Sequence, residues 1–315
     1  MIVTRYRLAA ALAVGLLVLT AVSISPLMQP FHVRSEAVAN QTLNETVDKA
    51  FTALRSGDFA PAAALGKAGP AMIPAVAAYL RDGNEDVRRQ AVTLLGQSGD
   101  ATAGPHLAIA LADPSDDIVR RASEALYKIG GDAVSDPSVG AALREAVEAG
   151  RDSAGAILLL GYVAGDKTVA TLNALRSKDA DRSTEVFHWS PVMPVAFVAD
   201  VALARLGDAD AKGRLMAAVR GGDLDSLMFL LSALRDIEDS DILGTLAEAT
   251  LSDRRPVEGD VPSHADVDTR LADVAAARFS ERYGLTAGGG PKADRARSDD
   301  ELDAVRKAVA ERLGR

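Results

Sequence analysis

The sequence predicts an all-α fold, an α-α superhelix of about six helical-hairpin repeats. The first observation is a gap-free internal match at a spacing of 32 residues, in which Val87-Arg88-Arg89 recurs as Val119-Arg120-Arg121. The second is the low aromatic content, 4% of a 315-residue chain, which suits helices packed through small and aliphatic side chains. The third is a recurring Gly-Asp pair, found at Gly99-Asp100, Gly131-Asp132, Gly165-Asp166 and Gly207-Asp208.

Each Gly-Asp pair predicts the end of one helix and the start of the next. Glycine adopts the left-handed conformation that ends a helix, and aspartate caps the first turn of the helix that follows. Apolar residues three and four apart then predict the first helix of a hairpin, as at Leu107, Ala110 and Leu111. A polar break such as Asp82-Gly83-Asn84 leads to the second helix. Because neither helix can bury its apolar stripe alone, the hairpins are expected to stack.

The second helix of the hairpin carries a family resemblance. Asp86-Val87-Arg88 opens this helix and Leu95-Gly96 ends it, and the pattern returns as Asp117-Ile118-Val119-Arg120 and Ile129-Gly130. In these residues the chain resembles the HEAT-repeat family, in its bacterial HEAT-like form, over about residues 70–284. The resemblance implies a curved scaffold whose faces hold protein partners, and it implies no reaction.

Residues 1–23 are predicted to be a signal peptide or an N-terminal membrane anchor. Arg5 and Arg7 precede Leu8–Val22, a stretch without a charged side chain. If the segment is not cleaved, Leu8–Met28 gives about 32 Å of helix, enough to cross a bilayer. Under both readings the solenoid is extracytoplasmic, in the periplasm or cell envelope, secreted or anchored by the N-terminal helix. A buried N-terminal helix of a cytosolic protein is the remaining alternative.

Four further segments follow from the pattern. Residues 24–42 are predicted to be a linker, and residues 43–287 the HEAT-like α-solenoid. Residues 288–298 contain Gly288-Gly289-Gly290-Pro291 and are predicted to be a flexible loop. Residues 299–315 are predicted to form a C-terminal capping helix, because the last repeat of a solenoid needs one polar face.

The composition gives no support for catalysis. The chain has no cysteine, and its four histidines (His32, His106, His188 and His264) are far apart, without the spacing of metal ligands. The sequence therefore predicts no catalytic residue, no cofactor, no metal site and no enzyme activity. The formal net charge of −9 disfavours a nucleic-acid partner, because binding to a phosphate backbone requires a positive surface.

The paired arginines of the second helices have two possible roles. The first of each pair, Arg88 or Arg120, is expected to bond the acidic residue of an adjacent layer, Asp86 or Asp117, and so to fix the stacking register. The second of each pair is expected to face solvent. If a binding groove exists, Arg89 and Arg121 are therefore its candidate residues.

An insertion at Ser177–Pro194 supplies the other candidates for partner binding, Phe187, His188 and Trp189. Insertions in a solenoid emerge on one face, often the binding face, and tryptophan is enriched at the energetic centres of interfaces. The alternative is that Phe187 and Trp189 fold back as a lid over the fourth repeat. A second insertion, Asp253–His264, has no aromatic residue.

Taken together, these features predict a non-catalytic, exported or membrane-tethered scaffold that binds another protein through its solenoid surface. Membrane contact is expected only through the N-terminal segment, if it is uncleaved. Two alternatives remain: a HEAT-like enzyme or enzyme-maturation factor, and a small-ligand receptor that uses the concave groove. The identity of the protein partner does not follow from the sequence.

Overall fold

The computed structural model describes residues 29–151, 153–178, 182–184, 191–257, 269–291 and 295–315, with side chains from residue 41 onward. Nearly all of these residues are in helices or in the turns between them. The chain divides into two compact units, Met1–Leu65 and Gly66–Arg315. The predicted signal or anchor segment, residues 1–23, lies outside the described residues.

The first unit contains two helices, α2 (Gln29–Arg55) and α3 (Ala60–Ala64). Val47, Phe51 and Leu54 form the buried stripe of α2. The predicted linker, residues 24–42, is helical from Gln29 onward, with Pro30 in the first turn, where a helix tolerates it. The start of the solenoid at residue 43 stays a prediction.

The second unit consists of six helical hairpins and a final helix, which agrees with the predicted number of repeats. The first three hairpins contain η1 (Leu65–Met72), α4 (Ile73–Ala77), η2 (Ala78–Arg81), α5 (Glu85–Gln97), η3 (Ala101–Ala103), α6 (Gly104–Ala110), α7 (Asp116–Ile129), η4 (Gly131–Val134), α8 (Pro137–Glu148) and α9 (Ala154–Leu160). The rest contain α10 (Asp166–Lys178), α11 (Val195–Arg205), α12 (Ala209–Gly221), α13 (Leu224–Ser232), η5 (Leu234–Asp236), α14 (Ser240–Leu251), α15 (Leu271–Tyr283), η6 (Ala287–Gly289) and α16 (Asp299–Arg312).

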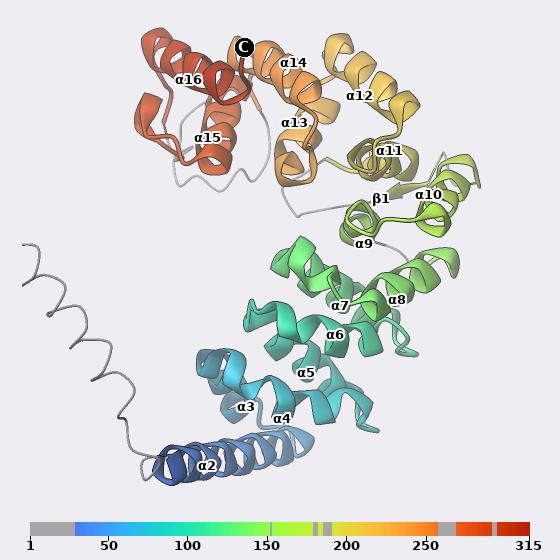
Figure 1. Ribbon diagram of the computed structural model, residues 1–315, viewed down its shortest axis with the longest axis vertical. Helices are drawn as coiled ribbons and strands as arrows, with labels where there is room; N and C mark the ends of the chain where they lie inside the picture. Colours follow the sequence, from blue (N-terminus) through green and yellow to red (C-terminus); the bar gives the residue numbers. More distant parts are fainter. Residues whose placement is uncertain (1–28, 152, 179–181, 185–190, 258–268, 292–294) are drawn as a thin grey trace, which may run out of the picture. The chain divides into compact units, whose positions relative to one another are not determined.

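Successive hairpins stack along the second unit (Figure 1). The first helices of the hairpins contact one another, as α6 contacts α8 and α14 contacts α16, and we call these helices the first row. The second helices also contact one another, as α5 contacts α7, α7 contacts α9 and α9 contacts α11, and we call them the second row. Each row covers the apolar face of the other. The architecture is the predicted all-α superhelix.

The Gly-Asp turns are confirmed at two sites and shifted at a third. Gly99 has a φ of 64°, and Asp100 accepts a hydrogen bond of 2.9 Å from the Thr102 backbone N–H. Gly207 has a φ of 91°, and Asp208 caps α12 through the Ala211 N–H at 2.7 Å. At Gly131-Asp132 the preceding glycine, Gly130, takes the positive φ instead, so Asp132 falls inside η4 and caps no helix.

The glycine that ends the second helix allows close packing of the second row. A Cβ added at Gly96 would lie 2.7 Å from the Cβ of Ala125, well inside van der Waals contact. Leu94, Leu95 and Leu126 are fully buried around this contact between α5 and α7. The Leu-Gly motif therefore marks where two second-row helices approach most closely.

Short antiparallel pairings close both insertions at their bases. β1 (Ser183–Thr184) pairs with β2 (Met193–Pro194) in the first insertion. In the second, Pro256 forms a bridge with Arg270. No strand was expected, yet these pairings span so few residues that the all-α class is unchanged.

The C-terminal helix α16 buries Leu302, Val305 and Val309 against α14 and α15. In the described part of residues 288–298, which were predicted to be a flexible loop, one side chain is buried. Arg297 is only 3% exposed, and its guanidinium donates hydrogen bonds of 2.9 Å to the Asp273 carbonyl and 2.8 Å to the Gly290 carbonyl. The carbonyl group of Gly290 in this segment therefore accepts a hydrogen bond from the buried Arg297.

One segment among the described residues, Ala60–Arg81, has the length and hydropathy of a membrane span. This test considers length and composition alone. Gly69, with φ 63° and ψ −153°, breaks the segment into short helical pieces. Ile73, Val76 and Leu80 are buried in the protein.

Candidate binding surfaces

The ends of the second-row helices meet around a buried carboxylate, Asp236, in η5. Six residues form this group, which we call the Asp236 cluster: Tyr127 of α7, Tyr162 after α9, Arg205 of α11, Arg235 and Asp236 of η5, and Arg282 of α15. They come from the C-terminal ends of five second-row helices or from the turns after them, with Arg235 and Asp236 both in η5. Five hairpins therefore contribute to one polar cluster.

Two tyrosine hydroxyls donate to the Asp236 carboxylate. The Tyr127 Oη lies 2.6 Å from Oδ2, and the Tyr162 Oη lies 2.9 Å from Oδ1. Tyr162 also lies 3.2 Å from the Arg235 carbonyl oxygen, a second acceptor. Asp236 is 1% exposed and Tyr127 is 3% exposed, so both side chains are closed to solvent.

Three arginines surround these tyrosines and satisfy backbone carbonyls at helix ends. The Arg235 guanidinium lies 3.7 Å from the Tyr127 ring centroid, and that of Arg205 lies 3.6 Å from the Tyr162 ring centroid. Arg235 also donates to the Tyr127 carbonyl, and Arg282 donates to the carbonyls of Leu234 and Ile237. Carbonyl groups at a helix C-terminus carry partial negative charge, so cations are stabilised there.

Burial shifts the titration of the Asp236 cluster. Removal from water raises the pKa of Asp236, and the hydrogen bonds from Tyr127 and Tyr162 with the charges of Arg235 and Arg205 offset part of the rise. Burial likewise raises the pKa of Tyr127 and of Tyr162, and the Asp236 charge adds to both shifts. Both phenols therefore remain hydrogen-bond donors at neutral pH.

The Asp236 cluster joins hairpins that are not neighbours in the stack. Repeats in a solenoid ordinarily contact only their immediate neighbours. Here a side chain of α7 bonds η5 although α9 and α11 lie between them in the second row. The second row is therefore tied across four hairpins.

Our reading of the sequence missed the Asp236 cluster, although a periodic signal for it exists. Tyr127, Tyr162, Arg205 and Arg282 each stand two or three residues before a glycine of positive φ. These glycines, Gly130, Gly165, Gly207 and Gly284, mark successive helix ends. A tyrosine or arginine two or three residues before such a glycine is therefore the sequence pattern that marks the cluster.

The predicted partner-binding residues fall into two groups. Phe187, His188 and Trp189 lie outside the described residues. Arg89 and Arg121 are brought together by one carboxylate, since Oδ2 of Asp117 lies 3.0 Å from the Arg89 Nε and 2.8 Å from the Arg121 Nε. Arg120 donates to the other oxygen of Asp117 at 2.7 Å.

Carboxylates also occupy the remaining donors of Arg89. Its terminal nitrogens bond Glu85 and Asp86 of its own helix. Hydrogen bonds from Arg121, Arg120 and Arg89 lower the pKa of Asp117 to about 2. Arg89 therefore links its layer to the next through Asp117, while Arg121 bonds Asp117 within its own helix.

The bond to an adjacent layer that was expected of Arg88 and Arg120 forms only at Arg88, and with a different acidic residue. Arg88 forms a two-point bond with Asp113 of the next layer, with Nε–Oδ2 at 2.7 Å and Nη2–Oδ1 at 3.2 Å, and not with Asp117. Arg120 bonds only Asp117 and Glu124 of its own helix. The acid Asp113 stands three residues before α7, whereas the residue three positions before α9 is the cation Arg151, so the equivalent acidic partner for Arg120 is missing at that position.

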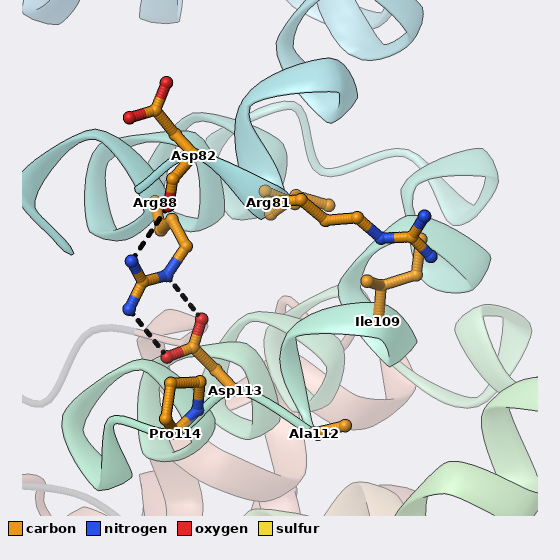
Figure 2. Close-up of a pocket in the computed structure, with 8 residues that line it drawn as sticks. Arg81, Asp82, Arg88, Ile109, Ala112, Asp113 and Pro114 are labelled. Atoms are coloured by element: carbon orange, nitrogen blue, oxygen red, sulfur yellow. Dashed lines mark hydrogen bonds and ion pairs between the residues drawn. The ribbon is translucent and has the colours of Figure 1, made fainter. Parts of the chain in front are cut away.

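An open hollow of about 440 Å³, which we call the Arg81 notch, lies beside the Arg88–Asp113 pair (Figure 2). Its lining combines apolar and charged side chains: Leu80, Arg81, Asp82, Arg88, Ile109, Ala112, Asp113 and Pro114. Ile109 is 39% exposed. In Figure 2 the Arg81 side chain extends toward Ile109 and away from the Arg88–Asp113 pair. Among the described residues, no three His, Asp or Glu side chains gather as metal ligands would.

Comparisons with known proteins find a likeness to HEAT repeats in part of the chain. Residues 60–128 match the family model for HEAT repeats. No curated protein matches the chain. A solved structure of the complex of CpcE and CpcF of phycocyanin lyase from Nostoc sp. PCC7120 is similar at 18% identity and a TM-score of 0.47, covering 85% of this chain and 94% of that one. Residues 60–128 are therefore similar to HEAT repeats, and the stacked helical hairpins are consistent with this likeness.

Proposed function

We propose that the protein is a non-catalytic scaffold that binds another protein through its HEAT-repeat surface. The observation that carries this proposal is the Asp236 cluster, in which Tyr127 of α7 bonds Asp236 across two intervening helices. A solenoid tied between non-neighbouring hairpins holds its second row in one arrangement. Binding to such a preformed surface costs less conformational entropy than binding to a pliable stack.

The geometry of the Asp236 cluster argues against a catalytic role for Asp236. A catalytic carboxyl group has to reach its substrate. Asp236 is 1% exposed, and both of its oxygens accept hydrogen bonds from tyrosines of this chain. A buried carboxylate satisfied in this way supports a structural role.

Affinity purification with crosslinking from the native cells tests the scaffold. We expect one or a few proteins to be retained in defined proportion by the full-length chain and lost after its thermal unfolding. If no protein is retained, or if retention does not depend on folding, the scaffold proposal fails. A Phe187→Ala/Trp189→Ala double variant tests the insertion, because loss of the partner with an unchanged melting temperature would assign the contact to it.

We also propose that the HEAT repeats lie outside the cytoplasm, secreted or anchored by the N-terminal segment. Arg5 and Arg7 followed by the uncharged stretch Leu8–Val22 support this location. Alkaline phosphatase fused after Arg315 is expected to be active, and a cytoplasm-dependent reporter at the same site inactive; the reverse result would refute export. N-terminal sequencing of the mature protein distinguishes cleavage from anchoring.

A further inference from the structure

The Arg81 notch combines a bonded pair of charges with an arginine that has no bonded partner among the described residues. Arg88 and Asp113 bond each other there, and Asp113 also accepts the Ser115 backbone N–H at 2.9 Å. Asp82 accepts the Asn84 N–H at 2.9 Å. Arg81 has no hydrogen bond or ion pair with any residue that the structure describes, and its side chain is exposed. The notch therefore presents an unsatisfied cation to a ligand.

The wall next to this cation is apolar. Leu80, Ile109, Ala112 and Pro114 all line the hollow, and Ile109 remains 39% exposed. Burying the exposed face of Ile109 under an apolar side chain would be favourable. A ligand that complements the notch therefore carries a carboxylate beside an apolar group.

We propose that the Arg81 notch docks a short acidic segment of the protein partner, with an aspartate or glutamate on Arg81 and an adjacent aliphatic or aromatic side chain on Ile109. The assignment rests on the proposed scaffold function and adds the place and chemistry of one contact. The guanidinium of arginine suits a carboxylate because it offers parallel N–H donors.

The net charge of the chain limits how this segment can bind. At −9 the protein repels a long acidic tail at a distance. A contact between one carboxylate and Arg81 acts within the screening length of about 8 Å at physiological salt. The segment is therefore short, with its acidic residue flanked by apolar ones and not by a run of acids.

A phage-displayed library of random peptides, selected on the purified full-length protein, provides the probe. We expect selected peptides to share an Asp or Glu next to Leu, Ile or Phe. By fluorescence polarisation, Arg81→Glu is expected to weaken a selected peptide about tenfold or more, and Ile109→Ala several-fold. Arg220→Glu is the matched control, because Arg220 is also exposed on a helix, α12, and has no bonded partner among the described residues; binding should be unchanged.

The other outcomes would refute the proposal that the Arg81 notch docks an acidic segment. Selected peptides without an acidic residue, equal binding by Arg81→Glu, or no selected peptide would each refute it. Co-sedimentation with vesicles containing anionic phospholipid, lost on Arg81→Glu, would assign Arg81 to a membrane surface and likewise refute the protein segment. These results leave the scaffold proposal standing if the crosslinked partner is still retained. If that partner is absent as well, the scaffold proposal fails with them.

Discussion

Tyr127 and Asp236 stand 109 positions apart in the chain, yet the Tyr127 hydroxyl donates a 2.6 Å hydrogen bond to the Asp236 carboxylate. The bond joins α7 to η5 past α9 and α11. In a stack of repeats held together only by neighbours, a local opening need not affect distant repeats. The Tyr127–Asp236 bond couples them, so its loss is expected to affect several hairpins together.

Removal of the Tyr127 hydroxyl tests this coupling. Tyr127→Phe is expected to lower the free energy of unfolding by about 1–3 kcal/mol, because a buried carboxylate loses one of its two tyrosine donors. Urea unfolding followed by circular dichroism measures the change. Tyr283→Phe is the matched control, because the buried Tyr283 hydroxyl has no hydrogen-bond partner among the described residues. Its effect should stay within about 0.5 kcal/mol; equal losses in both variants would contradict the special role of Tyr127.

The pH dependence of stability should carry a contribution from Asp236 with an unusual sign. Burial raises the pKa of Asp236 above its ordinary value of about 3.9, so the folded protein retains a proton that the unfolded chain has released. This contribution to stability is complete below about pH 3.9 and declines as pH rises through the raised folded pKa. Asp117 acts in the opposite direction, since its pKa of about 2 gives stability that is lost only as pH falls from about 4 through 2.

Asp236→Asn isolates the first of these contributions. Asparagine keeps an acceptor for one tyrosine, and Tyr162 can donate to the Arg235 carbonyl, 3.2 Å from its hydroxyl. Relative to Asp236→Asn, the wild type is expected to lose stability as pH rises above about 4 and through the raised pKa of Asp236, as measured by urea midpoints at several pH values. A difference that is independent of pH would show that Asp236 does not titrate in this range.

The repeat architecture was predictable because its determinants are local. Gly99, Asp100 and the apolar spacing of each helix act within a few residues, so they leave a periodic pattern in the sequence. The contacts of Arg88 were predicted less well, because its partner, Asp113, lies in the turn before α7 and not in the helix motif itself. Which acidic residue an arginine meets depends on packing between layers and not on the local motif.

The Asp236 cluster was not predicted because it depends on the path of the whole second row. Whether Tyr127 meets Asp236 is decided by the rotation between successive hairpins, added over several repeats. Small changes in each rotation would separate the two side chains without changing any local pattern. The carbonyl groups bonded by arginines such as Arg282 likewise cannot be predicted from the neighbouring sequence.

The Arg88–Asp113 pair is expected to be the strongest single contact between two layers. The Arg88 and Asp113 side chains are only 13% and 4% exposed, so Arg88→Ala leaves a buried carboxylate without its cation. We expect a loss of about 3 kcal/mol in the free energy of unfolding. Arg120→Ala, at a side chain that is 49% exposed, should cost less than about 1 kcal/mol. In a double-mutant cycle, Arg88→Ala and Asp113→Ala together should cost clearly less than the sum of the two; additive losses would rule out a direct pair.

The last helix should depend on a single buried arginine. Arg297 donates to the Asp273 and Gly290 carbonyls, and its own backbone N–H bonds the Asp273 carboxylate at 2.8 Å. Asp273 is fully buried in α15, so these bonds hold the start of α16 on the previous hairpin.

Arg297→Ala is expected to speed amide hydrogen exchange across Asp299–Arg312 at least tenfold, since about 1.4 kcal/mol of local opening free energy corresponds to a factor of ten. Exchange in α5 should not change, because α5 lies in a distant hairpin. Arg312→Ala, at an exposed arginine of the same helix, is the control. Equal exchange in the Arg297→Ala variant and the wild type would mean that Leu302, Val305 and Val309 alone hold the helix in place.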